Sequence, residues 1–281
     1  MKMKKIFINL SDYEYPNPFM DYGVRLAKSL NRPAKLIGIE KIPVPVTPTI
    51  GAGMNSVLPN PLSMDDVVSW VQPKMENLKL QAKEIWQDVS YDLEVGFPES
   101  KLEEITQEQK PYLVVVEGND DVSTMDEWFG THETRLAENL DAPVLIVQGD
   151  NVWKPLKHIL YMMDIEDHAV DNMRIISDIA KVTNADITVA VISGDEDEIV
   201  EKNAKYLRMV KTFRQVLGYN KVNYMQIFSE NAAGTVGELV AEKGADWLAF
   251  EHKDRSFLTR IFDDYNTEHL ILHSKIPVLV F

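Results

Sequence analysis

Few residues in this 281-residue sequence have types and spacings that suggest chemistry. His269 and His273 lie four apart in a predicted helix, where two imidazoles share a face and can hold a metal. They lack the H-E-x-x-H order, so a helix-packing or C-terminal charge role is the simpler interpretation. The acidic run from Asp195 to Glu198 could bind a cation, but at a predicted helix start it is better explained by the positive end of the helix dipole. With no G-x-S-x-G elbow either, we predict no metal site, no catalytic residue and no enzyme.

The elements that must position any site occur in two similar copies. Three segments of the first copy recur in the second, namely Lys5 to Ser11 at His158 to Asp164, Lys110 to Glu117 at Gly244 to Glu251, and Asp141 to Val147 at Lys275 to Phe281. The last two pairs share one offset of 134 residues. We therefore expect two domains in tandem, residues 1–150 and 151–281, each large enough to bury its own core.

Each copy alternates short apolar runs with amphipathic helical stretches. In the first copy we predict strands at about 5–10, 34–39, 91–95, 112–117 and 144–148, and helices at about 18–30, 64–88, 99–109 and 131–140. In the second we predict strands at about 158–163, 186–192, 222–228, 246–250 and 277–281, and helices at about 168–182, 196–217, 233–243 and 265–273. Unbroken apolar runs such as Leu113 to Val116 are typical of parallel strands covered on both faces. The predicted fold class is α/β, with two open, mainly parallel five-stranded sheets and helices on both faces.

Composition narrows the setting. The sequence has no cysteine, which suits a reducing compartment. The apolar run that follows the first lysines, Ile6 to Leu10, is too short for a signal peptide, so we expect a cytoplasmic protein without a membrane segment. The formal net charge is −15, with −10 in residues 1–150 and −5 in residues 151–281. Such an acidic chain is a poor partner for nucleic acid.

The first copy carries extra residues, which we assign mainly to the proline-rich segment from Pro43 to Leu62. Its five prolines exclude a helix interior. It could be a flap over the sheet, an arm that docks a partner or a plain surface loop.

The most specific stretch runs from Gly130-Thr131 through a predicted helix to Pro143-Val144. With a strand that ends in an acidic turn and a glycine-bearing loop after strand four, it resembles the universal stress protein family in its tandem two-domain form. The resemblance covers essentially the whole chain. It implies an adenine nucleotide alpha-hydrolase-like fold, with the two copies packed as a pseudo-dimer around a twofold axis, as family dimers are.

The resemblance also implies where a nucleotide would bind. Nucleotide-binding members carry G-x2-G-x9-G-[ST] after strand four, because glycines and a helix N-terminus admit phosphates, and an Asp at the end of strand one. In the first copy Gly118, Gly130 and Thr131 survive, but Asp121 replaces the middle glycine and the outer spacing is one residue short. Ser11 replaces the aspartate, with Asp12 beside it.

The second copy breaks the pattern differently. Asp164 stands at the aspartate position, whereas His252, Arg255 and Asp264 replace the glycines, and Tyr265 replaces the hydroxyl residue. The basic residues around Arg255 could contact phosphates, but a solvated basic loop is the simpler interpretation.

These substitutions predict a non-catalytic cytoplasmic stress-response protein of the universal stress type, with a degenerate nucleotide site in both domains and no cofactor. The alternative is an ATP-binding sensor with a variant pocket in the first domain. A slow ATPase is a distant third, since no general base or Mg²⁺ site can be named. A protein partner and a homodimer both remain open.

Overall fold

The computed structural model describes residues 3–41, 64–118, 139–148, 151–163, 170–193, 199–228, 232–251 and 276–281. The first half contains β1 (Ile6–Leu10), α1 (Pro18–Ser29), β2 (Ala34–Glu40), α2 (Met64–Ile85), β3 (Val89–Val95), α3 (Pro98–Gln109), β4 (Leu113–Gly118) and β5 (Val144–Gln148). The second contains β6 (His158–Met163), α6 (Val170–Thr183), β7 (Asp186–Ser193), α7 (Ile199–Leu217), β8 (Val222–Phe228), α8 (Ala232–Lys243), β9 (Trp247–Phe250) and β10 (Val278–Val280). The proline-rich segment 43–62 lies outside the described residues.

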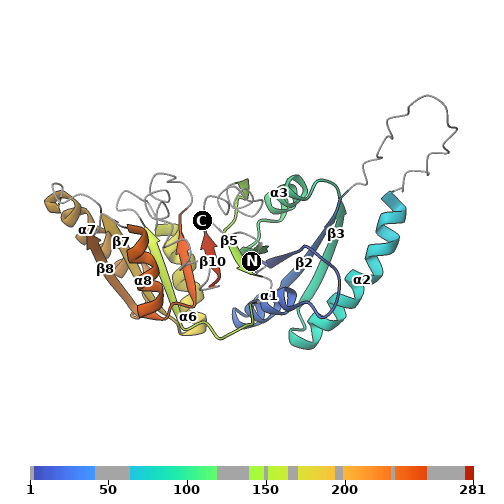
Figure 1. The fold of residues 1–281 in the computed structure, drawn as a ribbon, viewed down its shortest axis with the longest axis horizontal. Coiled ribbons are helices and arrows are strands. Elements are labelled where there is room, and N and C mark those ends of the chain that lie inside the picture. Colours follow the sequence, from blue (N-terminus) through green and yellow to red (C-terminus); the bar gives the residue numbers. More distant parts are fainter. Residues whose placement is uncertain are drawn as a thin grey trace, which may run out of the picture.

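The strands form one ten-stranded sheet with the order β3-β2-β1-β4-β5-β10-β9-β6-β7-β8. Within each half every pair of neighbouring strands is parallel. The order of the second half mirrors that of the first, so the two halves lie side by side with β5 and β10 in the middle (Figure 1). The predicted α/β fold class is confirmed.

The junction between the halves is the antiparallel pair β5 and β10. Leu145 lies opposite Leu279, its own counterpart at the 134-residue offset, and the flanking pairs are Val144 with Val280 and Ile146 with Val278. Such self-complementary pairing is what a twofold axis between two equal units produces. The predicted pseudo-dimer of two five-stranded, mainly parallel sheets is therefore present. The pairing of β5 with β10 joins the two sheets into one, because the edges of these strands satisfy each other's backbone hydrogen bonds.

Helices cover both faces of the sheet. Apolar side chains from α1, α2, α6 and α7 pack on one face, and side chains from α3 and α8 pack on the other. Each apolar layer contains buried residues of both halves. The two apolar layers therefore run across the junction, and the division into domains 1–150 and 151–281 stays a prediction.

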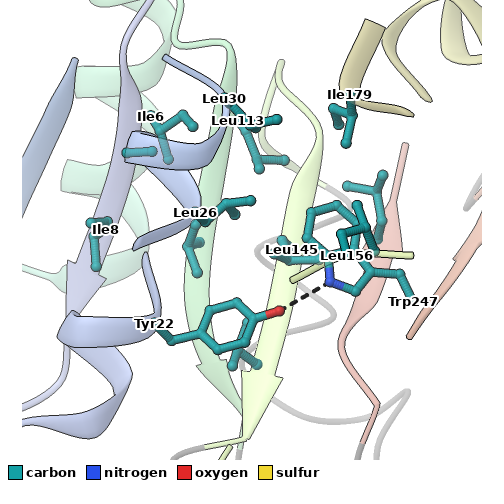
Figure 2. Close-up of a cluster of buried hydrophobic side chains, with 14 of the residues drawn as sticks. Ile6, Ile8, Tyr22, Leu26, Leu30, Leu113, Leu145, Leu156, Ile179 and Trp247 are labelled. Atoms are coloured by element: carbon teal, nitrogen blue, oxygen red, sulfur yellow. Dashed lines mark hydrogen bonds between the residues drawn. The ribbon is translucent and has the colours of Figure 1, made fainter. Parts of the chain in front are cut away.

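One buried hydrogen bond crosses the junction. The indole Nε1 of Trp247, in β9, donates to the hydroxyl of Tyr22, in α1, over 3.0 Å (Figure 2). Both side chains are almost fully buried, and Leu145 and Leu156 lie beside them in the same view. The first helix of one half is thus tied directly to the sheet of the other.

Candidate functional site

The carboxyl ends of parallel strands are where open α/β sheets bind ligands, at the point where the strand order reverses. In the first half this switch point lies between β1 and β4, and in the second half between β6 and β9. The sequence-predicted site residues belong to these two places.

A glutamate occupies the switch point of the first half. Asn9 of β1 lies opposite Val116 of β4, which brings the following residues together at the carboxyl edge. There the hydroxyl of Ser11 donates a hydrogen bond to the carboxylate of Glu117. Sequence reasoning missed Glu117 as a site residue, although its recurrence as Glu251 at the end of an otherwise apolar strand was a visible signal.

The structure places Asp12 in the loop before α1. Its Oδ1 accepts the backbone N–H of Glu14 over 3.0 Å and the side-chain amide of Asn17 over 3.1 Å. Asn17 in turn caps α1, because its side-chain oxygen accepts the backbone N–H of Met20 over 2.7 Å. One carboxylate oxygen of Asp12 therefore organises the entry into α1.

The ring of Tyr13 covers the carboxyl end of β2. A Cβ added at Gly38 would lie 3.0 Å from Cε1 of Tyr13 and 3.1 Å from the sulfur of Met75, so only glycine admits both side chains without a shift. Burial, together with the charges of Glu40 and Asp12, raises the pKa of the Tyr13 phenol above its ordinary value. Sequence reasoning missed Tyr13, although a lone glycine within a predicted strand signals such a close approach.

Gly118 is the last residue of β4 and pairs with Gln148 of β5. A Cβ added here would lie 3.2 Å from Cγ2 of Ile146, so the glycine also relieves crowding between neighbouring strands. The structure thus gives Gly118 a packing role within a regular strand. Its predicted companions Gly130 and Thr131 lie outside the described residues.

The second half repeats the glutamate with a different partner. Glu251 follows β9, and its Oε1 accepts a hydrogen bond from the side-chain amide of Asn172 in α6. Asp164, predicted from the sequence, lies outside the described residues, as does the basic loop around Arg255. Both switch points therefore carry a carboxylate that is held by a neutral donor.

Metal binding and membrane insertion find no support in the described part of the chain. Within it, no three His, Asp or Glu side chains are placed to hold a metal ion. The acidic run 195–198 and the histidines at 269 and 273 lie outside it. None of its helices is long and apolar enough to cross a bilayer.

Solved structures place this fold among known ones. A universal stress protein from Archaeoglobus fulgidus superposes with a TM-score of 0.68 at 11% identity, covering 99% of this chain and 96% of that one. A Pseudomonas aeruginosa protein described as a universal stress protein gives 0.61 at 17%, covering 99% and 92%. The cytoplasmic domain of a prokaryotic cation chloride cotransporter gives 0.54 at 8%, covering 100% and 95%. No protein-family model and no curated protein matches the sequence. The chain therefore has the fold of the universal stress proteins, as the sequence resemblance predicted.

Proposed function

We propose that this chain is a non-enzymatic, cytoplasmic stress-response protein of the universal stress type that has lost nucleotide binding in both halves. The fold supports the type, since two solved structures described as universal stress proteins match it along nearly its whole length. The loss of nucleotide binding rests on a local observation, the carboxylate at each switch point.

The Ser11 and Glu117 pair carries the proposal. The resemblance expects an aspartate at position 11 to hold the nucleoside; here that position is a hydroxyl already donated to Glu117. A phosphate that approached the same edge would meet the carboxylate of Glu117, and like charges repel each other near a protein surface. The hydrogen bond and the charge together disfavour an adenine nucleotide.

The second switch point supports the same conclusion. Asn172 holds Glu251 as Ser11 holds Glu117, with a different donor from a different element. A carboxylate at both places disfavours phosphate binding in either half, because such binding depends on an uncharged backbone cradle. What the protein does in stress would then depend on a protein partner or a second copy rather than on ATP.

Titration calorimetry with ATP and Mg²⁺ tests the proposal. We expect wild-type binding to be no tighter than about 1 mM, because several contacts of about 1–2 kcal/mol each are lost from a micromolar site. A dissociation constant in the low micromolar range would overturn the proposal and favour the ATP sensor.

A swap variant identifies the cause. Ser11→Asp with Glu117→Gln keeps a hydrogen bond between the two positions, reverses its direction and puts an aspartate at the end of β1. We expect this double variant to bind ATP at least about tenfold more tightly than wild type, equivalent to 1.4 kcal/mol. Glu251→Gln is the matched change in the other half and should not raise the affinity for ATP, because Asp264 and Tyr265 replace the glycine and hydroxyl residues of the phosphate loop there. A swap variant that folds but gains nothing would show that Glu117 does not block the site.

A further inference from the structure

A cavity lies between α1 and the segment that leads from β5 to the second half. Its volume is about 230 Å³, and we call it the α1 cavity. Its lining includes Asp21, Tyr22 and Arg25 from α1 and Asn151 and Trp153 from the connecting segment. None of these five residues belongs to the nucleotide pattern or to the two switch points.

Two aromatic rings form a wall of the α1 cavity. Tyr22 and Trp153 meet edge to face, with ring centroids 5.2 Å apart and planes at 75°. Tyr22 is fixed by burial and by the hydrogen bond from Trp247 of the other half. Aromatic faces attract organic cations, so this wall suits an ammonium group or an aliphatic stem.

Two opposite charges lie one helical turn apart at the same cavity. Asp21 and Arg25 have the i, i+4 spacing at which an acid and a base usually pair, yet no ion pair or hydrogen bond joins them among the described residues. Burial raises the pKa of Asp21, and the positive charge of Arg25 opposes this rise through space. Each charged group is therefore available to a ligand.

In the other half, a charged side chain at an equivalent position is already paired. The 153-residue offset from Ile6 to Ile159 carries Asp21 to Arg174 and Arg25 to Asp178. Arg174 forms an ion pair with Asp171 over 2.7 Å. The open pair is thus particular to the α1 cavity and does not follow from the helix position alone.

Asn151 adds a donor that no described residue accepts. Its side-chain Nδ2 is buried and makes no hydrogen bond within the described part of the chain, while its backbone N–H donates to the carbonyl of Gln148 over 3.0 Å. A buried amide N–H without a partner is unfavourable, and an acceptor bound in the cavity would relieve it.

We propose that the α1 cavity binds a small zwitterion, a molecule with a carboxylate beside a protonated amine, the class to which free α-amino acids belong. Arg25 and the amide of Asn151 receive the carboxylate. Asp21 and the ring wall of Tyr22 and Trp153 receive the ammonium group. The cavity is smaller than the roughly 300–1,000 Å³ of sites for drug-sized ligands, so it suits a small molecule better than a nucleotide.

The test is calorimetry of the full chain with each of the twenty L-amino acids in turn. We expect at least one to bind with a dissociation constant below about 1 mM. Its N-acetyl and carboxamide derivatives each lack one charge and should bind at least about tenfold more weakly, since each loses a charge-assisted contact. ATP with Mg²⁺ should not displace the amino acid, so this result is independent of the proposed loss of nucleotide binding.

Variants locate the site. Arg25→Gln and Asp21→Asn should each weaken binding at least about tenfold. Arg174→Gln, the matched change in the second half, should leave it unchanged. The proposal is overturned if no amino acid binds up to about 10 mM, if both derivatives bind as well as the parent, or if Arg174→Gln weakens binding as much as Arg25→Gln does.

Discussion

At the same point of the sheet, the two halves bury different polar side chains. Lys35 in β2 and Thr188 in β7 are counterparts at the 153-residue offset, and each is less than a tenth exposed. Lys35 forms an ion pair with Asp92 and donates to Gln109 over 2.8 Å. Thr188 contacts Nε2 of His158 over 2.9 Å instead.

The hydrogen bonds of the His158 ring have directions that can be assigned. Nδ1 of His158 lies 2.9 Å from the carbonyl oxygen of Lys243, so Nδ1 must carry a proton and donate it. When only Nδ1 is protonated, Nε2 accepts from the hydroxyl of Thr188. One half thus satisfies the position with an ion pair, and the other with a hydrogen bond between an imidazole and a hydroxyl.

This difference shows what the fold requires and what it leaves free. The apolar strands and their order are the same in both halves, while each polar position needs only some partner. The switch points follow the same rule, since Glu117 and Glu251 coincide at the 134-residue offset but Ser11 holds one and Asn172 the other. Sites can therefore diverge between the halves without loss of the sheet.

The prediction with the largest expected effect tests whether the two halves contribute equally to stability at their junction. Leu145→Ala and Leu279→Ala each remove a fully buried side chain from the central strand pair. Each should lower the free energy of unfolding by about 3 kcal/mol, as measured by urea denaturation, and the two losses should agree within about 1 kcal/mol.

The same variants test the shared core. Because the apolar layers cross the junction, both should unfold in one cooperative transition. The double variant should lose less than the sum of the two, since the side chains share one contact. Two separate transitions, each sensitive to one substitution, would mean that the halves are independent.

The second prediction compares the buried polar positions. Asp92→Ala should lower the unfolding free energy by about 2 kcal/mol, because it leaves the Lys35 ammonium buried without its carboxylate. Lys35→Met with Asp92→Leu removes both charges and should recover most of that loss. Equal stability of the single and double variants in urea denaturation would show that burial of the charge is not the cause.

Much of the fold could be predicted because the repeat and the apolar runs are local signals. The strand predicted at 5–10 is observed as Ile6–Leu10, and that at 222–228 as Val222–Phe228. The joining of two sheets into one was missed. An apolar run such as Val144 to Val147 shows that a strand is buried, but it does not show which strand lies next to it.

The site was harder to predict because it depends on contacts between distant segments. Asp12 was selected for its place after a strand, whereas the structure shows one of its oxygens holding Glu14 and Asn17 locally. Glu117 and Tyr13 were overlooked, since neither belongs to the family pattern. Sequence position alone does not reveal that Ser11 and Glu117 meet across 106 residues.

The third prediction concerns the hydrogen bond that ties the halves together. Tyr22→Phe removes the acceptor and leaves the buried indole N–H of Trp247 unpaired. In a double-mutant cycle with Trp247→Phe, we expect a coupling of about 1 kcal/mol in unfolding free energy. Tyr112→Phe is the matched control, because its hydroxyl reaches the carbonyl of Ile175 in the other half over a longer 3.4 Å. A coupling near zero, or a loss of stability for Tyr22→Phe no larger than that for Tyr112→Phe, would make this hydrogen bond incidental to the junction.

The smallest expected effect distinguishes the halves by their residual affinity for anions. From the sequence, Gly130-Thr131 offers bare backbone and a hydroxyl at a predicted helix start, whereas Asp264-Tyr265 puts a carboxylate at the equivalent place. Any weak binding of ADP or inorganic phosphate should therefore belong to the first half. Gly130→Asp should abolish detectable binding, because a loss of about 1 kcal/mol weakens an already millimolar affinity about fivefold. Lys253→Gln with Arg255→Gln serves as the control, since these residues belong to the basic loop of the second half. Phosphorus NMR titration detects such weak binding, and an affinity that follows Lys253 and Arg255 rather than Gly130 would assign the remaining anion site to the second half.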